Sequence, residues 1–189
     1  MRKYTKIPED AFNHIARNAG VIAKSFVPTT GVVTDILGAT TGGITFTDAP
    51  EYTDYGEDID NVPANMMELQ EITSRTVTLG STYVSVTEEL AKNLAAAADL
   101  TTESSASKIT PRDVLKTEDF EDIWWITDYS AEDGGFFAIH LKRALNKAGL
   151  SVVSSKNGKG NFAFTYTGHY TMQDVDDVPY EIYIGKATA

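Results

Sequence analysis

The segment between residues 161 and 172 constrains the fold most, because large apolar side chains alternate there with small or polar ones. The large side chains belong to Phe162, Phe164, Tyr166, Tyr170 and Met172. The positions between them hold Ala163, Thr165, Thr167, His169 and Thr171. A period of two places the two sets on opposite faces of a β-strand, with one face buried. Such a strand needs partner strands, so the segment predicts a sheet rather than a helical bundle.

Further segments carry shorter strand signals, bounded by residues that favour turns. Trp124 and Trp125 lie between two isoleucines, and this apolar run predicts a strand covered on both faces. The two tryptophans are therefore expected to be core or interface residues rather than a ligand platform. The other predicted strands are residues 32–37, 44–47, 67–74, 76–84, 120–129, 136–145 and 180–184.

One helix is predicted, after residue 84. Ser85 and Glu88 have the spacing of a capping box, in which a hydroxyl and a carboxylate satisfy the first free backbone donors. Leu90, Leu94 and Ala97 then form one apolar stripe of a helix that ends near residue 100. Residues 101–108, rich in Ser and Thr, are predicted to form a loop.

The first part of the chain, residues 1–30, is predicted to be an N-terminal arm. Phe12, Ile15, Ala16 and Ala19 have helical spacing, so a short helix and a loosely held arm both fit the pattern. Residues 1–189 are expected to form one domain, mainly β. The expected architecture is an antiparallel β-sandwich or barrel flanked by one principal α-helix.

An acidic segment interrupts the strands at residues 48–63. It lacks both apolar periods, and a loop of this length inside a small domain is usually functional or disordered. Its tyrosines and isoleucine favour contact with a partner, so we predict an interaction loop. The candidate contact residues are Asp48, Glu51, Tyr52, Asp54, Tyr55, Glu57, Asp58 and Ile59.

The charge balance of the chain argues against a protein that grips nucleic acid. Lys and Arg number 16 and Asp and Glu number 27, for a formal net charge of -11. Binding to phosphates needs clustered cations, and the sequence shows no concentration of them. There is no cysteine, which removes disulfides and thiolate sites. The opening residues, charged and broken by Pro8, predict neither a signal peptide nor a membrane span.

The sequence contains no recognisable group of catalytic residues. His140 and His169 are expected to be outward-facing polar residues of strands, and His14 has no recognisable partner. No nucleophile elbow, phosphate loop, dinucleotide fingerprint or zinc motif occurs. We therefore expect no enzymatic activity and no cofactor or metal. Two acidic groups could offer oxygens to calcium, without the spacing of an EF-hand: Asp54, Glu57, Asp58 and Asp60; and Asp174, Asp176 and Asp177.

Four stretches of the chain, taken in order, resemble one protein family. Residues 42–46 (GGITF) lead into the acidic loop, and residues 84–90 (VSVTEEL) enter the helix. Residues 161–170 (NFAFTYTGHY) and 178–183 (VPYEIY) lie near the end. In this order they resemble the major tail tube proteins of long-tailed, siphovirus-type bacteriophages, over residues 31–184. The N-terminal arm lies outside the resemblance.

The resemblance implies a structural virion protein that forms hexameric rings, stacked into a helical tube. Inner strands of the six subunits would join into one ring-wide barrel, and the 48–63 loop would reach a neighbouring ring. The implied partners are further copies of the chain, the tape measure protein in the lumen, and tail terminator and distal tail proteins. The protein would be made in the host bacterial cytoplasm and reside in the phage tail, with no membrane partner.

Genome DNA would pass through such a tube without specific binding. A wall with net negative charge repels a polyanion and keeps it centred, over about 8 Å in physiological salt. We therefore expect some of the excess carboxylates to face the lumen.

Two alternative functions fit the same residues. A tail terminator or another tail-completion protein would form one ring and stop, whereas a tube protein polymerises. A β-sandwich binding module unrelated to phages would read a sugar or a protein with its Trp and Tyr side chains.

Overall fold

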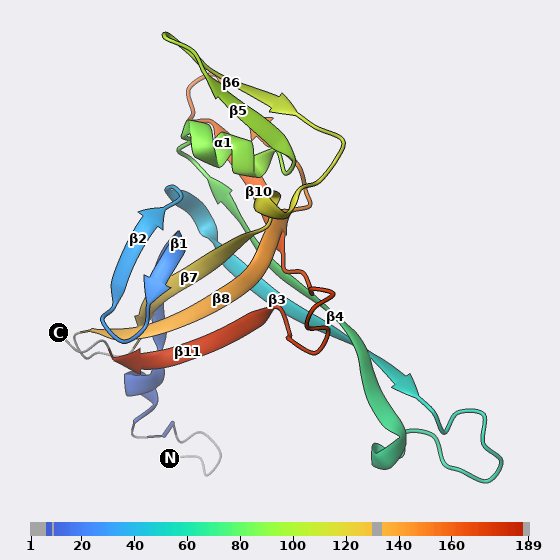
Figure 1. Ribbon diagram of the computed structural model, residues 1–189. Coiled ribbons are helices and arrows are strands. Elements are labelled where there is room, and N and C mark those ends of the chain that lie inside the picture. The colour runs from blue at the N-terminus through green and yellow to red at the C-terminus, as the bar shows by residue number, and fades with distance from the viewer. Residues whose placement is uncertain (1–6, 9, 130–133, 187–189) are drawn as a thin grey trace.

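The computed structural model describes residues 7–8, 10–129 and 134–186. Eleven strands, three single turns of 3-10 helix and one short α-helix follow one another along these residues. All named strand pairs are antiparallel, which confirms the prediction of a mainly β, antiparallel fold with one principal helix. A long two-stranded arm extends from the body of the molecule (Figure 1). No helix in the described part of the chain has the length and apolar character needed to cross a membrane.

Nine strands form one strongly bent sheet, in the order β2-β1-β7-β8-β10-β4-β3. Strand β11 pairs with β8 and β9 with β10 beside this path, while β5 and β6 form a separate hairpin. The strands are β1 (Ala16–Val27), β2 (Val32–Ile36), β3 (Thr40–Asp54), β4 (Gln70–Tyr83), β5 (Ala98–Thr102), β6 (Ser107–Pro111), β7 (Glu121–Tyr129), β8 (Gly135–Asn146), β9 (Ser151–Val153), β10 (Asn161–Thr167) and β11 (Tyr180–Lys186).

Strand β8 belongs to both halves of this sheet. It pairs with β7 and β11 as far as Ala144 and Leu141, and then with β10 through Leu145 and Asn146. Arg143, between the paired residues Leu141 and Ala144, has a φ of 49°, a left-handed conformation that is uncommon outside glycine. The strand therefore turns a corner at Arg143 and passes from one half of the sheet to the other.

The main core lies between the two halves of the sheet and the helix. Its members come from β1, β4, β7, β8, β10, the helix and the segment after β2, and the alternation predicted for 162–167 is confirmed at Phe164 and Tyr166, which are buried while their neighbours are not. The buried residues are Ile22, Leu37, Val77, Leu79, Tyr83, Leu90, Leu94, Ile123, Leu141, Ala144, Phe164 and Tyr166. The predicted alternation fails beyond Thr167, where β10 ends: Met172 is 98% exposed.

A second, aromatic cluster covers the opposite face of β1, β7 and β8. Phe26 makes edge-on contacts with Trp124 and Phe136, at centroid distances of 5.5 and 5.0 Å. Trp124 is buried in this cluster, while Trp125 packs on the main core from the other face. The prediction that strand 120–129 is covered on both faces is confirmed.

The helix is shorter than predicted and begins later. Helix α1 (Glu88–Leu94) has Thr87 as its N-cap, whose side chain accepts a hydrogen bond from the backbone nitrogen of Leu90. The predicted capping role of Ser85 is wrong, since its hydroxyl accepts from the nitrogen of Ala39 at 2.9 Å. The predicted loop at 101–108 is also wrong in part, because the β5–β6 hairpin begins at Ala98 and crosses this segment.

Asn146 joins the end of β8 to its surroundings. Its buried Nδ2 donates to the carbonyl oxygens of Leu94 at 2.8 Å and Gly149 at 3.0 Å. Its Oδ1 accepts from the nitrogen of Thr165 at 2.9 Å. One satisfied amide thus links α1, β8 and β10, as a buried polar group requires.

The predicted N-terminal arm is wrong from residue 16 onwards. Strand β1 lies inside the sheet between β2 and β7, and its register with β7 shifts between Arg17 and Val21. A short 3-10 turn, Ala11–His14, precedes it. The bulge explains the missed strand, since it breaks the period of two in this segment.

Candidate assembly surfaces

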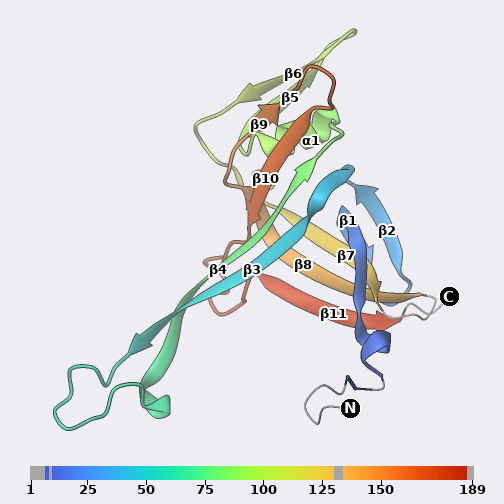
Figure 2. The same ribbon diagram turned by 180° about the vertical axis from the view of Figure 1, so that it is seen from behind.

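The acidic segment forms the outer end of β3 and part of the turn of a long β-hairpin, not a free loop. Strand β3 pairs with β4 as far as Asp54 and Gln70, with register shifts between Thr41 and Thr45 and between Glu51 and Tyr52. The predicted loop boundaries, 48–63, are therefore wrong at the start: residues 48–54 are strand, and the turn region runs from residue 55 to 66. We call residues 48–75 the arm. Figures 1 and 2 show it reaching well beyond the rest of the sheet.

The tip of the arm, residues 55–69, is held in shape by the carboxylate of Asp54. Its two oxygens accept from the backbone nitrogens of Gly56 and Asn65, each at 2.8 Å. These bonds favour the charged form and lower the pKa of Asp54, with the Asn65 bond the larger cause. Leu69 closes the turn, since its carbonyl accepts from the nitrogen of Tyr55 at 3.0 Å. The tip therefore has a defined shape to present to a partner.

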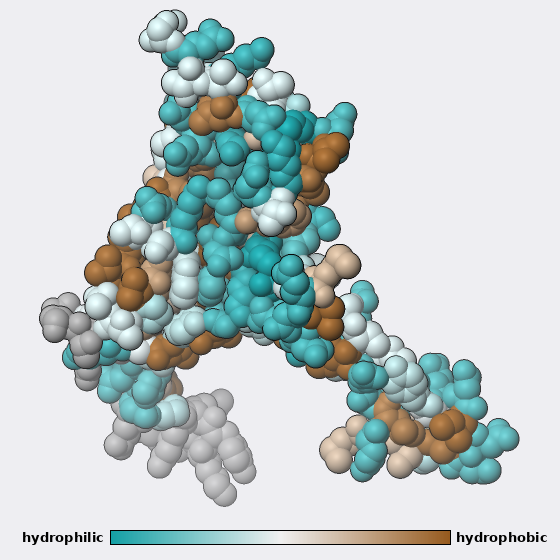
Figure 3. Space-filling model, viewed as in Figure 1, coloured by the Kyte–Doolittle hydropathy of each residue, from teal (hydrophilic) through white to brown (hydrophobic). Residues whose placement is uncertain are grey.

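Apolar side chains on the arm are exposed to solvent. Met67 is 81% exposed and Tyr52 is 63% exposed. Figure 3 shows hydrophobic surface at the end of the arm, bordered by hydrophilic residues. The exposed large apolar residues of the arm are Tyr52, Tyr55, Ile59, Met66, Met67 and Ile72. A rimmed apolar patch on a projecting element is typical of an interaction site.

The arm carries most of the protein's net charge. Eight acidic residues and one basic residue lie in 48–75, a formal charge of -7 out of -11. At its base Asp48 pairs with Arg75 and accepts from the Tyr180 hydroxyl at 2.9 Å. Further out, Glu51 accepts from Ser74 at 2.7 Å. The arm is thus tied to the body at its base and acidic along its length.

The predicted contact residues divide into two groups in the structure. Tyr52, Tyr55, Glu57, Asp58 and Ile59 are exposed on the outer part of the arm, where a partner can reach them. Asp48, Glu51 and Asp54 are instead engaged within the arm, with Arg75, Ser74 and the backbone nitrogens of Gly56 and Asn65 as their partners. Met66 and Met67 were missed by the sequence reasoning, although two adjacent methionines beside an acidic turn are an available signal.

Each of two further strands, β2 and β11, has one edge that pairs with no other strand among the described residues. Strand β2 ends the sheet path beyond β1, and β11 pairs only with β8. Each exposes apolar side chains: Val32 and Ile36 on β2, Ile182 and Ile184 on β11. Edge strands of this kind can pair with another chain.

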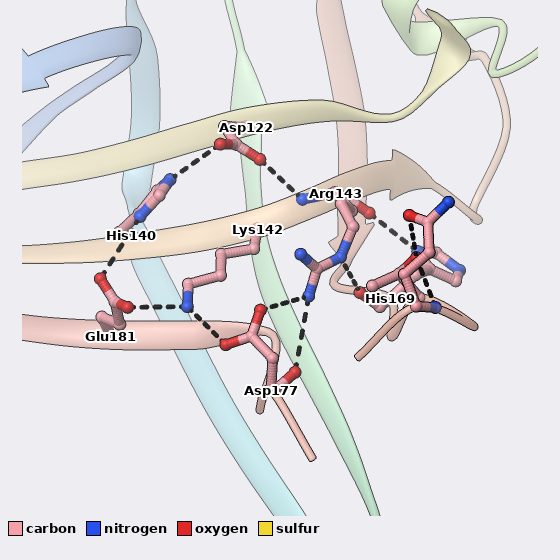
Figure 4. Close-up of polar contacts among 9 residues, drawn as sticks. Asp122, His140, Lys142, Arg143, His169, Asp177 and Glu181 are labelled. Carbon is pink, nitrogen blue, oxygen red and sulfur yellow. Dashed lines mark hydrogen bonds and ion pairs between the residues drawn. The ribbon is translucent and has the colours of Figure 1, made fainter. Parts of the chain in front are cut away.

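A polar network crosses β7, β8 and β11 (Figure 4). Lys142 Nζ lies 2.7 Å from Asp177 Oδ1 and 2.7 Å from Glu181 Oε1. Arg143 donates through Nε to the His169 carbonyl at 2.7 Å, and its backbone nitrogen donates to Asp122 at 2.9 Å. These bonds fix the corner of β8, where Arg143 has its left-handed backbone.

His140 extends this network toward the aromatic cluster. Its ring stacks on Trp124 with centroids 4.1 Å apart, and Nε2 lies 3.2 Å from Asp122 Oδ2. The prediction of an outward-facing polar residue is therefore wrong for His140, whose side chain is largely covered. Because each of these charged groups has a partner on another strand or on the segment before β11, the network joins the strands of this half of the sheet.

The network is expected to make the stability of the fold depend on pH in the acidic range. Hydrogen bonds from Lys142, first, and Arg143 lower the pKa of Asp177, and the bond from Lys142 lowers the pKa of Glu181. A lowered carboxyl pKa gives stability that is present at neutral pH and is lost as the pH falls below about 4. We expect Asp177→Asn to flatten the acid side of the pH–stability curve, measured by urea unfolding between about pH 7 and pH 3.

The matched control for this experiment is Asp176→Asn, one residue away and exposed. It should leave the acid side of the curve nearly unchanged. Equal flattening by the two variants would contradict a specific role for the Asp177 ion pairs.

The two acidic groups considered for calcium do not form a metal site. Among residues 7–8, 10–129 and 134–186, no three His, Asp or Glu side chains are grouped to hold a metal ion. Asp177 faces Lys142 and Arg143, and Asp54 binds backbone nitrogens.

No protein-family model matches the chain, and no curated protein matches it either.

Proposed function

We propose that this chain is a non-enzymatic structural subunit that assembles with itself into stacked hexameric rings, forming the tail tube of a siphovirus-type bacteriophage. The observation that carries the proposal is the arm: a two-stranded hairpin, joined to the body only at its base, with exposed Tyr, Ile and Met side chains at its end. Removing those side chains from water is favourable in free energy, and only another molecule can cover them at the end of the arm. A repeating subunit supplies such a molecule in every ring.

The free edges of β2 and β11 support closure within a ring. They lie at opposite ends of the same half-sheet, β2-β1-β7-β8-β11. A contact between β2 of one subunit and β11 of the next would pair two free edges and cover Val32, Ile36, Ile182 and Ile184. Repeated six times, such a head-to-tail contact closes a ring.

The charge of the protein supports a conduit for DNA. A tube wall with net negative charge repels the genome instead of binding it, so the DNA can slide during ejection. The remaining partners follow from the same proposal: the tape measure protein fills the lumen before the DNA, and tail terminator and distal tail proteins close the two ends. The protein would then reside in the virion.

Electron microscopy of the purified, concentrated protein tests the proposal. We expect hollow tubes or stacked rings with a wall one subunit thick. Single rings that never stack would instead favour a tail terminator or another tail-completion protein. A protein that stays monomeric at high concentration, also when the tape measure protein is added, would overturn the proposal and favour the binding module.

A further inference from the structure

A second part of the chain has the opposite charge to the arm. Residues 134–173 contain five Lys and Arg and no Asp or Glu. Lys142 and Arg143 are engaged in the polar network. The other three are Lys147, Lys156 and Lys159, which are exposed and whose ammonium groups have no ion pair within the described part of the chain. We call residues 147–160 the lysine segment.

The lysine segment also exposes apolar side chains. Leu150, Val152 and Val153 are each more than half exposed. Strand β9, which holds the two valines, is three residues long and pairs with β10 alone. The segment therefore combines an apolar centre with positive charge, as the arm tip combines an apolar centre with negative charge.

The two surfaces lie at opposite ends of the molecule. Figures 1 and 2 show the β9–β10 turn beside α1 and the β5–β6 hairpin, and the arm tip at the far end of the molecule. A rigid chain cannot bring its own arm tip to its own lysine segment. Any contact between them joins two copies, and a head-to-tail contact of this kind repeats without closing when copies stack.

We propose that the arm tip of one copy docks on the lysine segment of a copy in the adjacent ring. This rests on the proposed function and adds the receiving surface. Glu57, Asp58 and Asp60 are exposed and have no partner among the residues that the structure describes, so three carboxylates meet three ammonium groups. Opposite charge selects the partner and the orientation, while Ile59 and the tyrosines cover the valines of β9.

Disulfide trapping tests the contact directly, because the natural chain has no cysteine. Ile59→Cys and Val153→Cys are made in two chains of different tag length, mixed, assembled and oxidised. We expect a mixed-size disulfide dimer from this pair. The control pairs Ile59→Cys with Met172→Cys, an exposed position outside both surfaces, and should give little mixed dimer. Equal yields from both pairs, or none from the first, would overturn the proposal.

Charge exchange gives a second readout. Glu57→Lys, Asp58→Lys and Asp60→Lys together should abolish stacking, and so should Lys147→Glu, Lys156→Glu and Lys159→Glu together. Mixing the two variants should restore contact between unlike copies and give alternating assemblies or dimers. Tubes that form normally from either triple variant alone would overturn the docking.

The two proposals fail in different ways. Tubes of the unaltered protein without the mixed disulfide would refute this docking site and leave the tube function standing. A specific mixed disulfide in small oligomers, with no tubes under any condition, would support the docking and refute the tube. Absence of both would refute both.

Discussion

A chain in which Asn-Gly replaces residues 55–69 is expected to fold and to form no tubes. Asp54 and Gln70 are direct partners in the β3–β4 ladder, so a two-residue turn can join them without changing the register. The replacement removes the exposed Tyr55, Ile59 and Met67 and the carboxylates of the tip. The main core lies elsewhere in the molecule, so the subunit should keep its cooperative unfolding.

Electron microscopy and sedimentation measure assembly of this variant, and circular dichroism with urea unfolding measures its fold. The matched control shortens the other hairpin: Asn-Gly replaces residues 103–106, between the paired Thr102 and Ser107. That variant should still form tubes. Normal tubes from the chain without the arm tip would contradict the assembly role of the arm.

The second large effect is expected at Gly20, in the bulge of β1. Its φ is +73°, and a Cβ added there would lie 2.2 Å from the carbonyl oxygen of Ile126. It would also lie 2.9 Å from Trp125 Nε1, which donates to the Ala19 carbonyl. Backbone cannot yield as a flexible side chain can, so β1 must move away from β7. We expect Gly20→Ala to lower the free energy of unfolding by about 3 kcal/mol or more.

Gly149→Ala separates the clash from the backbone conformation. Gly149 has nearly the same φ, +71°, but an added Cβ meets no atom within 4 Å. Its cost should be only the left-handed conformation, about 1 kcal/mol. Urea unfolding of both variants in the chain lacking the arm tip gives the free energies without interference from assembly. Similar losses from the two variants would show that the clash contributes little.

Strands with an intact period could be predicted from the sequence. The segments 120–129 and 136–145 are largely buried in the structure, and their many apolar residues indicate this burial in the sequence. Strand β1 was missed because Asn18 and Gly20 adopt positive φ in a bulge, which shifts the faces on either side. The outer half of β3 was missed for another reason: none of residues 48–54 is fully buried, so no apolar alternation marks this part of the strand.

The candidate surfaces divide along similar lines. The acidic turn could be predicted because its residues are adjacent in the sequence. The polar network could not, since Asp122, Lys142 and Asp177 meet only after β7, β8 and the segment before β11 come together. Identifying the lysine segment as a surface needs both the sequence and the structure, because its charge is visible in the sequence but its position at the opposite end of the molecule from the arm tip is not.

The two-stranded structure of the arm has a mechanical consequence. If arms hold successive rings together, stretching the tail pulls along the axes of β3 and β4. The load enters at the turn and leaves at the base, so the backbones of both strands carry it together and the hydrogen bonds between them are not sheared. Strand β4 passes the load to β10 through a second ladder, whose hydrogen bonds lie across the strands and are sheared together instead of being peeled open singly. A fibre built this way would yield abruptly at a high force and extend little before it breaks.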